Sequence, residues 1–110
     1  MSSLVVDGIR LSDKHTVVIV AKTQAETTAP FAIRANIANT FICGELADSE
    51  EVAVEVYDPS VEDFVRLYDD GDAVKFTSGY HKINFKDESM LIRFVKSITS
   101  ENVGLSAFYA

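Results

Sequence analysis

The fold is decided by the second half of the chain, which contains the successive segments EVAVEVYD (51–58), FVRLYDD (64–70), AVKFTSG (73–79), YHKINF (80–85), SMLIRFVKS (89–97) and VGLSAFYA (103–110). Only a few residues separate each apolar-rich segment from the next. Within the first segment, Val52, Val54 and Val56 recur with the period of two that is typical of a strand. Short strands joined by frequent turns indicate an antiparallel β-sandwich or a small barrel.

The rest of the chain extends this pattern. Asp70-Gly71 lies between two apolar segments and predicts a tight hairpin. HTVVIVAKT (15–23) is apolar on both faces, which predicts a strand covered on both sides. Shorter strands are expected at 31–35 and 39–44. We therefore predict one all-β domain over residues 1–110, an Ig-like or jelly-roll-like antiparallel sandwich of about eight to nine short strands with little or no helix. Residues 1–8 are expected to form an extended N-terminal arm.

Residues 59–68 leave an alternative open. Val61, Phe64, Val65 and Tyr68 follow one another at helical spacing, so this segment also fits an amphipathic helix. The strand interpretation is preferred because FVRLYDDGDAVKF (64–76) is typical of two strands joined at Asp70-Gly71.

Charge and composition exclude several classes of partner. The chain has 10 Lys and Arg against 17 Asp and Glu, for a net charge of −7, and its basic residues are not clustered. Nucleic acid and anionic membrane surfaces would both repel such a protein, so neither is expected as a partner. No segment is apolar over the roughly 18 residues that a membrane span needs. The first residues, MSSLVVDGIR, lack the pattern of a secretory signal, so we expect synthesis in the cytoplasm without secretion.

Few residues are suited to catalysis or metal binding. Cys43 is a lone cysteine without His or Lys near it in sequence, so we expect a small buried hydrophobe. His15 and His81 are far apart, and each is expected as a solvated residue at the start of a strand. No G-x-S-x-G motif and no Trp occur. We therefore predict a protein that is not an enzyme, with no catalytic residues, no cofactor and no metal.

Two acidic clusters contain the oxygen ligands that Ca²⁺ prefers, but neither has the ordered ligand spacing of a calcium-binding loop. Both are expected to be solvated turns. They comprise Asp69, Asp70 and Asp72, and Asp48, Glu50 and Glu51.

Sugar binding is an alternative function for a small β-sandwich, because exposed aromatic rings bind sugars. The candidates by residue type are Tyr57, Tyr68, Tyr80 and Tyr109. The simpler expectation is that each ring caps the core and leaves its hydroxyl in water.

Two segments have large apolar side chains on both faces, VVIVA (17–21) and MLIRFV (90–95). In a small sandwich one face of each strand belongs to the core, and the other then needs cover from a loop, a sheet edge or another chain. We therefore expect self-association into a homo-oligomer.

Residues 30–110 resemble a group of small structural proteins encoded by tailed bacteriophages. The resemblance lies in three turn-and-strand motifs: Gly44, Leu46, Glu51 and Val52; then Gly71, Phe76 and Thr77; then Arg93, Val95, Lys96, Thr99, Val103 and Gly104. The chain departs from the group in lacking an aromatic residue, often Trp, after the central strand, where Phe64 stands in.

This resemblance implies a component of the virion without catalytic residues. The function expected from it is capsid decoration, with the major capsid protein or other virion proteins as partners and the virion as location. A neck or tail accessory protein, or a carbohydrate- or protein-binding adaptor module, is the alternative. A further alternative is a host-directed inhibitor whose carboxylates imitate nucleic acid, and this would require carboxylates lining one face.

Overall fold

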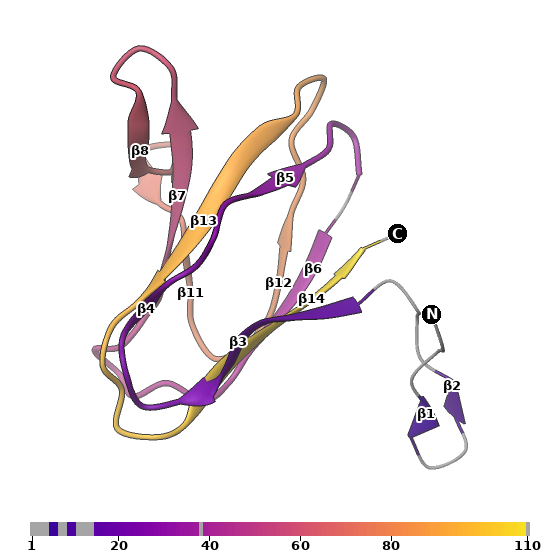
Figure 1. Ribbon diagram of the computed structural model, residues 1–110, viewed down its shortest axis with the longest axis vertical. Coiled ribbons are helices and arrows are strands. Elements are labelled where there is room, and N and C mark those ends of the chain that lie inside the picture. Colours follow the sequence, from indigo (N-terminus) through magenta and orange to yellow (C-terminus); the bar gives the residue numbers. More distant parts are fainter. Residues whose placement is uncertain (1–4, 7–8, 11–14, 38, 110) are drawn as a thin grey trace.

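The chain folds as an antiparallel β-sandwich, seen in a computed structural model that describes residues 5–6, 9–10, 15–37 and 39–109 (Figure 1). No helix occurs in that part of the chain, so none there could span a membrane. The predicted all-β sandwich is confirmed. The strands are more numerous than expected because several connections contain two-residue pairings.

One sheet has six strands and the other has four. The six-stranded sheet contains β4 (Glu26–Thr27), β5 (Phe31–Ile33), β7 (Val52–Asp58), β8 (Asp63–Arg66), β11 (Lys75–Phe76) and β13 (Met90–Lys96). The four-stranded sheet has the order β12 (Gly79–Ile83), β6 (Asn39–Cys43), β14 (Val103–Tyr109) and β3 (His15–Lys22). Two further pairs of strands form separate two-stranded sheets: β1 (Val5–Val6) with β2 (Ile9–Arg10), and β9 (Tyr68–Asp69) with β10 (Asp72–Ala73).

Aromatic rings join the two sheets. Phe41 comes from the four-stranded sheet, whereas Phe76 and Phe94 come from the six-stranded one. The three ring centroids lie 5.2–5.3 Å from one another, and all three side chains are buried. Such contacts are favourable beyond the area that they bury. The alternating valines of β7 and the apolar residues of β13 and β14 complete this core.

The segment over residues 59–68 is extended and not helical. After a turn at 59–62, β8 pairs with β7 from Asp58↔Asp63 to Glu55↔Arg66. The helical spacing of the apolar residues in this segment was therefore misleading. Figure 1 shows β7 and β8 as a hairpin that rises beyond the body of the sandwich. Because this hairpin has little core to cover it, Val61 and Val65 remain exposed.

The predicted hairpin at Asp70-Gly71 is confirmed. Asp69 pairs with Asp72, and both central residues have positive φ, 53° for Asp70 and 87° for Gly71. Two positive φ angles are the requirement of a type I′ turn, which Asp-Gly meets readily. Of the expected arm over residues 1–8, only Val5–Val6 is described, and these residues pair with Ile9–Arg10. The remainder of the arm lies outside the described residues.

The pairing of β14 with β3 is irregular, and this decides which way the β3 side chains point. The register shifts on both sides of the pair Leu105↔Ile19, so that Ser106 lies opposite Val17 and Val103 opposite Lys22. Ile19 stays in the core, while Val17 moves to the outer face, the opposite of what strict alternation gives. The expectation that residues 15–23 are covered on both sides is wrong for the described chain.

Gly104 makes this irregular pairing possible. A Cβ atom placed there would lie 2.9 Å from the Ile19 carbonyl oxygen and 3.0 Å from the Ala21 nitrogen. Both are backbone atoms, so the strands would have to separate. Glycine within a strand commonly marks such a close approach.

We predict that Gly104→Ala lowers the free energy of unfolding by about 1–3 kcal/mol, because the added methyl group forces the backbones apart. Ser106→Ala is the matched control, since Ser106 lies two residues along on the same side of β14, and its effect should stay within about 0.5 kcal/mol. Urea denaturation monitored by circular dichroism measures both. An unchanged midpoint for Gly104→Ala would contradict the tight packing.

Candidate interaction surface

The two histidines, which are potential acid–base or metal-binding residues, both contact aromatic rings. His15 does begin β3, as expected, and its ring lies 6.1 Å from that of Phe108. His81 lies in the middle of β12, so the expectation of a solvated residue at the strand start is wrong for it. Its ring stacks on Phe76 at 4.6 Å, and its Nε2 is 2.8 Å from the Thr77 carbonyl oxygen. The two histidines belong to opposite edge strands of the four-stranded sheet.

The acidic cluster at 48–51 is more structural than expected. The Glu50 carboxylate accepts hydrogen bonds from the backbone nitrogens of Ala47, at 2.9 Å, and Ser100, at 2.8 Å. These bonds lower the pKa of Glu50, the one from Ala47 most strongly. Glu51 pairs with Arg66, at 3.2 Å, and lies 3.9 Å from the Lys75 ammonium. Both carboxylates therefore hold loops and strands in place, so the solvated turn predicted from the sequence is not observed for them.

No metal site is assembled in the described part of the chain, where no group of three or more His, Cys, Asp or Glu side chains converges. A shallow hollow of about 280 Å³ lies beside the 46–50 turn, lined by Leu46, Ala47, Asp48, Glu50, Thr77 and Ser78. Two of its polar side chains accept backbone hydrogen bonds: the Ser78 hydroxyl from the Leu46 nitrogen at 2.7 Å, and the Glu50 carboxylate from the Ala47 nitrogen at 2.9 Å.

Cys43 is buried, as predicted, with 3% of its surface exposed. Burial raises the pKa of its thiol, and the charge of Lys96 opposes that shift. A raised pKa reduces the thiolate fraction at neutral pH, so the geometry supports a packing role for this residue.

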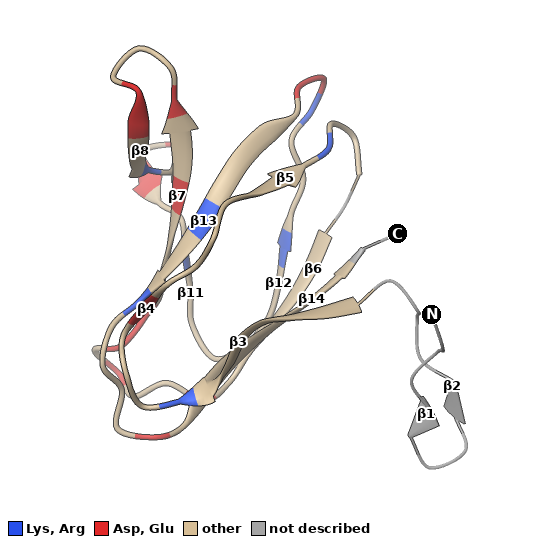
Figure 2. Ribbon diagram, viewed as in Figure 1, with Lys and Arg blue, Asp and Glu red and all other residues tan. Residues whose placement is uncertain are grey.

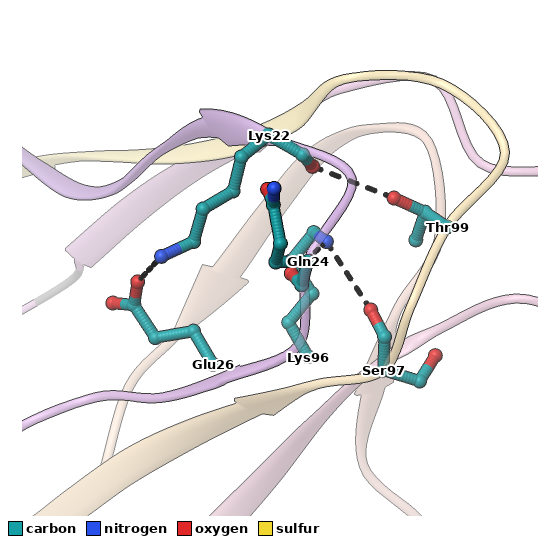
Figure 3. Close-up of polar contacts among 6 residues, drawn as sticks. All are labelled: Lys22, Gln24, Glu26, Lys96, Ser97 and Thr99. Atoms are coloured by element: carbon teal, nitrogen blue, oxygen red, sulfur yellow. Dashed lines mark hydrogen bonds and ion pairs between the residues drawn. The ribbon is translucent and has the colours of Figure 1, made fainter.

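Lys96 is the most deeply buried charged side chain among the described residues, with 1% of its surface exposed. Its ammonium donates hydrogen bonds to the carbonyl oxygens of Gln24, at 2.7 Å, and Ser97, at 3.2 Å (Figure 3). Desolvation lowers the pKa of Lys96, and the nearby charge of Lys22 lowers it further. Because Gln24 lies where the chain passes from β3 to β4, Lys96 ties this crossing between the sheets to the end of β13.

The sequence motif contains Lys96 but does not indicate this role. Thr99 strengthens the same end of the sandwich, because its nitrogen donates to the Thr23 carbonyl at 2.9 Å and its hydroxyl to the Glu101 carbonyl at 2.8 Å. Lys22 pairs with Glu26 across the crossing, as Figure 3 shows. Only the folded arrangement brings these groups together.

The three tyrosines whose side chains are described do not form one sugar-binding platform. Tyr80 lies on β12 of the four-stranded sheet, whereas Tyr57 lies on β7 of the other sheet and packs edge-on against Phe64 at 5.5 Å. Tyr68 belongs to the β9–β10 hairpin and is exposed, which differs from the ring-capped core expected for it. The side chain of Tyr109 lies outside the described residues.

The outer face of the four-stranded sheet is the candidate interaction surface. Paired registers place Tyr80, Ile42, Ser106 and Val17 in one row across all four strands. Three of these side chains are large, apolar or aromatic, and well exposed: Tyr80 at 62%, Ile42 at 47% and Val17 at 60%. Val20, on β3, adds an exposed side chain at 70%. We call the surface formed by Val17, Val20, Ile42, Tyr80 and Ser106 the apolar face.

No Asp or Glu occurs in the four strands that carry the apolar face, although the chain has 17. In Figure 2 these strands are tan apart from lysines on β12 and at the end of β3. Carboxylates are instead abundant on the rising hairpin and the turn that follows it, where residues 57–72 hold six acidic side chains and one Arg. The strands of the apolar face therefore expose apolar side chains without carboxylates beside them, whereas Val61, Val65 and Tyr68 are exposed among the carboxylates of residues 57–72.

The outer face of the six-stranded sheet, unlike the apolar face, carries ion pairs. There the Arg93 Nε donates to the Glu55 carboxylate at 2.6 Å, and the Arg93 guanidinium lies over the Phe64 ring at 4.4 Å. Glu51 and Arg66 add a second ion pair. This sheet therefore combines ion pairs with exposed Leu91 and Tyr57, whereas the strands of the apolar face contain no carboxylate.

A conservative and a truncating change at Lys96 should separate its two contributions. Lys96→Ala removes the buried stem and the donor, and we expect a loss of about 3 kcal/mol in the free energy of unfolding. Lys96→Met keeps a stem of similar length, so we expect a loss of about 1 kcal/mol. Thermal and urea denaturation measure both. Equal losses in the two variants would contradict a packing contribution from the stem.

Glu50 should make the free energy of unfolding larger at neutral pH than at acidic pH. Since its pKa is lower in the folded chain, its contribution is present above the ordinary value of 4.5 and is lost as the pH falls through the folded pKa. We expect Glu50→Gln to reduce the difference between the free energies of unfolding at about pH 7 and about pH 3. Glu88→Gln, at an exposed carboxylate with no hydrogen bond among the described residues, is the control. If Glu50→Gln leaves this difference unchanged, the hydrogen bonds from Ala47 and Ser100 do not stabilise the ionised carboxylate.

Comparison with protein families, with curated proteins and with solved structures finds no match to this chain.

Proposed function

We propose that this chain is a non-enzymatic structural protein that acts by protein–protein contact, and that it serves as a capsid decoration protein on the outer shell of a tailed bacteriophage. The observation that carries the first part is the apolar face: exposed Val17, Val20, Ile42 and Tyr80 lie on strands without a carboxylate. Exposed apolar groups that gather on one face of a small domain mark a site of protein contact. The motifs in residues 30–110 that resemble phage structural proteins support the second part.

The charge distribution supports a place outside the packaged DNA. Net charge is −7, and the six carboxylates at 57–72 extend from one end of the sandwich. A surface of this sign is repelled by nucleic acid but keeps particles soluble and separate from one another. A rigid two-sheet body with one adhesive face is the form that such a role requires.

The same distribution gives less support to a protein that imitates nucleic acid. That function needs carboxylates lining a continuous face, whereas one sheet face here has none and the other holds Glu55 and Glu51 in ion pairs. The carboxylates on the hairpin lie on a projection and not on a face.

Quantitative mass spectrometry of particles purified from the phage that encodes this chain tests the proposal. We expect a copy number comparable with that of the major capsid protein, because a decoration protein follows the repeat of the shell. A small number of copies, matching the symmetry of a portal or tail ring, would move the protein to the neck or tail. Absence from the particles would overturn the virion assignment.

A further inference from the structure

We propose that the apolar face docks on the same face of a second copy of this chain, forming a two-fold symmetric dimer. This inference rests on the proposed protein-contact function, because it uses the same surface. It does not depend on the virion location. It names the partner for a face that is exposed in the single chain.

The apolar face has large and small side chains next to each other, so a second copy of the same face can pack against it. Ser106 is a small residue on β14, and it lies between Ile42 on β6 and Val17 on β3. The exposed part of the sheet therefore has a ridge at Ile42 and a depression beside it. β6 and β14 are neighbours at the centre of the four-stranded sheet.

A two-fold axis that lies in the interface, parallel to the strands and between β6 and β14, exchanges these two strands. It places Ile42 of one copy opposite Ser106 of the other, within the same row of paired residues. The same operation places Tyr80, on one edge strand, opposite Val17, on the other edge strand. Ile42 thus meets the small Ser106 at the centre of the row, and apolar side chains meet at its two ends, which suits the packing of aligned sheets about 10 Å apart.

Charge favours this arrangement over other contacts between copies. Two chains of net charge −7 repel each other, and the repulsion is strongest where their carboxylates approach. Because the four strands of the apolar face contain no Asp or Glu, face-to-face docking keeps the carboxylates of both copies at the periphery. The residual repulsion acts over distances that salt screens, so the dimer should become stronger as the salt concentration rises.

The size of the face predicts a weak dimer. Four strands spaced about 4.8 Å apart, each contributing about five residues, span roughly 19 by 17 Å, or about 300 Å² in projection. A stable interface usually hides about 800 Å² per partner. Even allowing for side-chain relief, the apolar face falls at the small end of specific interfaces. We therefore expect a dissociation constant of about 10 µM or weaker.

Sedimentation velocity of the purified full chain tests the proposal. From about 1 µM to about 1 mM protein, we expect a concentration-dependent shift from monomer to dimer. The shift should begin at lower protein concentration in about 500 mM than in about 50 mM NaCl. Ile42→Asp should leave the chain monomeric over this range, since it places a charge at the centre of the contact.

Leu91→Asp is the matched control, because Leu91 is exposed to a similar extent, 40% against 47% for Ile42, but belongs to the six-stranded sheet. It should dimerise as the unchanged chain does. Circular dichroism and thermal denaturation check that each variant is folded, and Val17→Asp, at an edge strand, replaces Ile42→Asp if that variant unfolds. Overturning results are a wild-type chain that stays monomeric, a dimer that weakens with salt, or equal disruption by Leu91→Asp.

The outcomes separate the two proposals. A monomer in solution that is nonetheless abundant on particles would remove the dimer and leave the shell as the surface that covers the apolar face. A salt-strengthened dimer that is absent from particles would remove the virion assignment and leave the dimer standing.

Discussion

The contact among Phe41, Phe76 and Phe94 is the constraint on which the rest of the structure depends. It is the point where the four-stranded and the six-stranded sheet meet, with all three rings within 5.3 Å of one another. A chain of 110 residues buries a single core, so each sheet has only one face available for it. Each sheet then has an outer face that the core does not use, and the two outer faces are free to differ.

The two outer faces differ in how many charged side chains they carry. The six-stranded sheet carries two ion pairs, Glu55 with Arg93 and Glu51 with Arg66. On the four-stranded sheet, the outer row is apolar at Tyr80, Ile42 and Val17. The proposed function and the proposed dimer both follow from this asymmetry, since burial of exposed apolar area is the main driving force for association. Glu50 and Lys96, by contrast, form hydrogen bonds with the backbone and so stabilise the fold.

Much of the fold could be predicted from local pattern. The alternation of Val52, Val54 and Val56, the Asp70-Gly71 turn and the buried Cys43 all depend on interactions between residues close in sequence or on simple transfer to the core. The segment at 59–68 was harder, because its apolar spacing fits a helix as well as a strand. Pairing with β7 decided for the strand, and this is a contact that local sequence does not contain.

By itself, the sequence determined an acidic all-β domain with a single core and too much apolar surface for that core alone. The reason is that periodicity, turn chemistry and net charge are properties of neighbouring residues and of composition. Only the tertiary structure decided which face of which sheet carries the apolar side chains that the core does not bury. The register shifts beside Leu105↔Ile19, permitted by Gly104, turn Val17 outward and align it with Ile42 and Tyr80 from distant strands. Strand register depends on backbone contacts between segments far apart in the chain, so no local pattern specifies which side chains share an outer face.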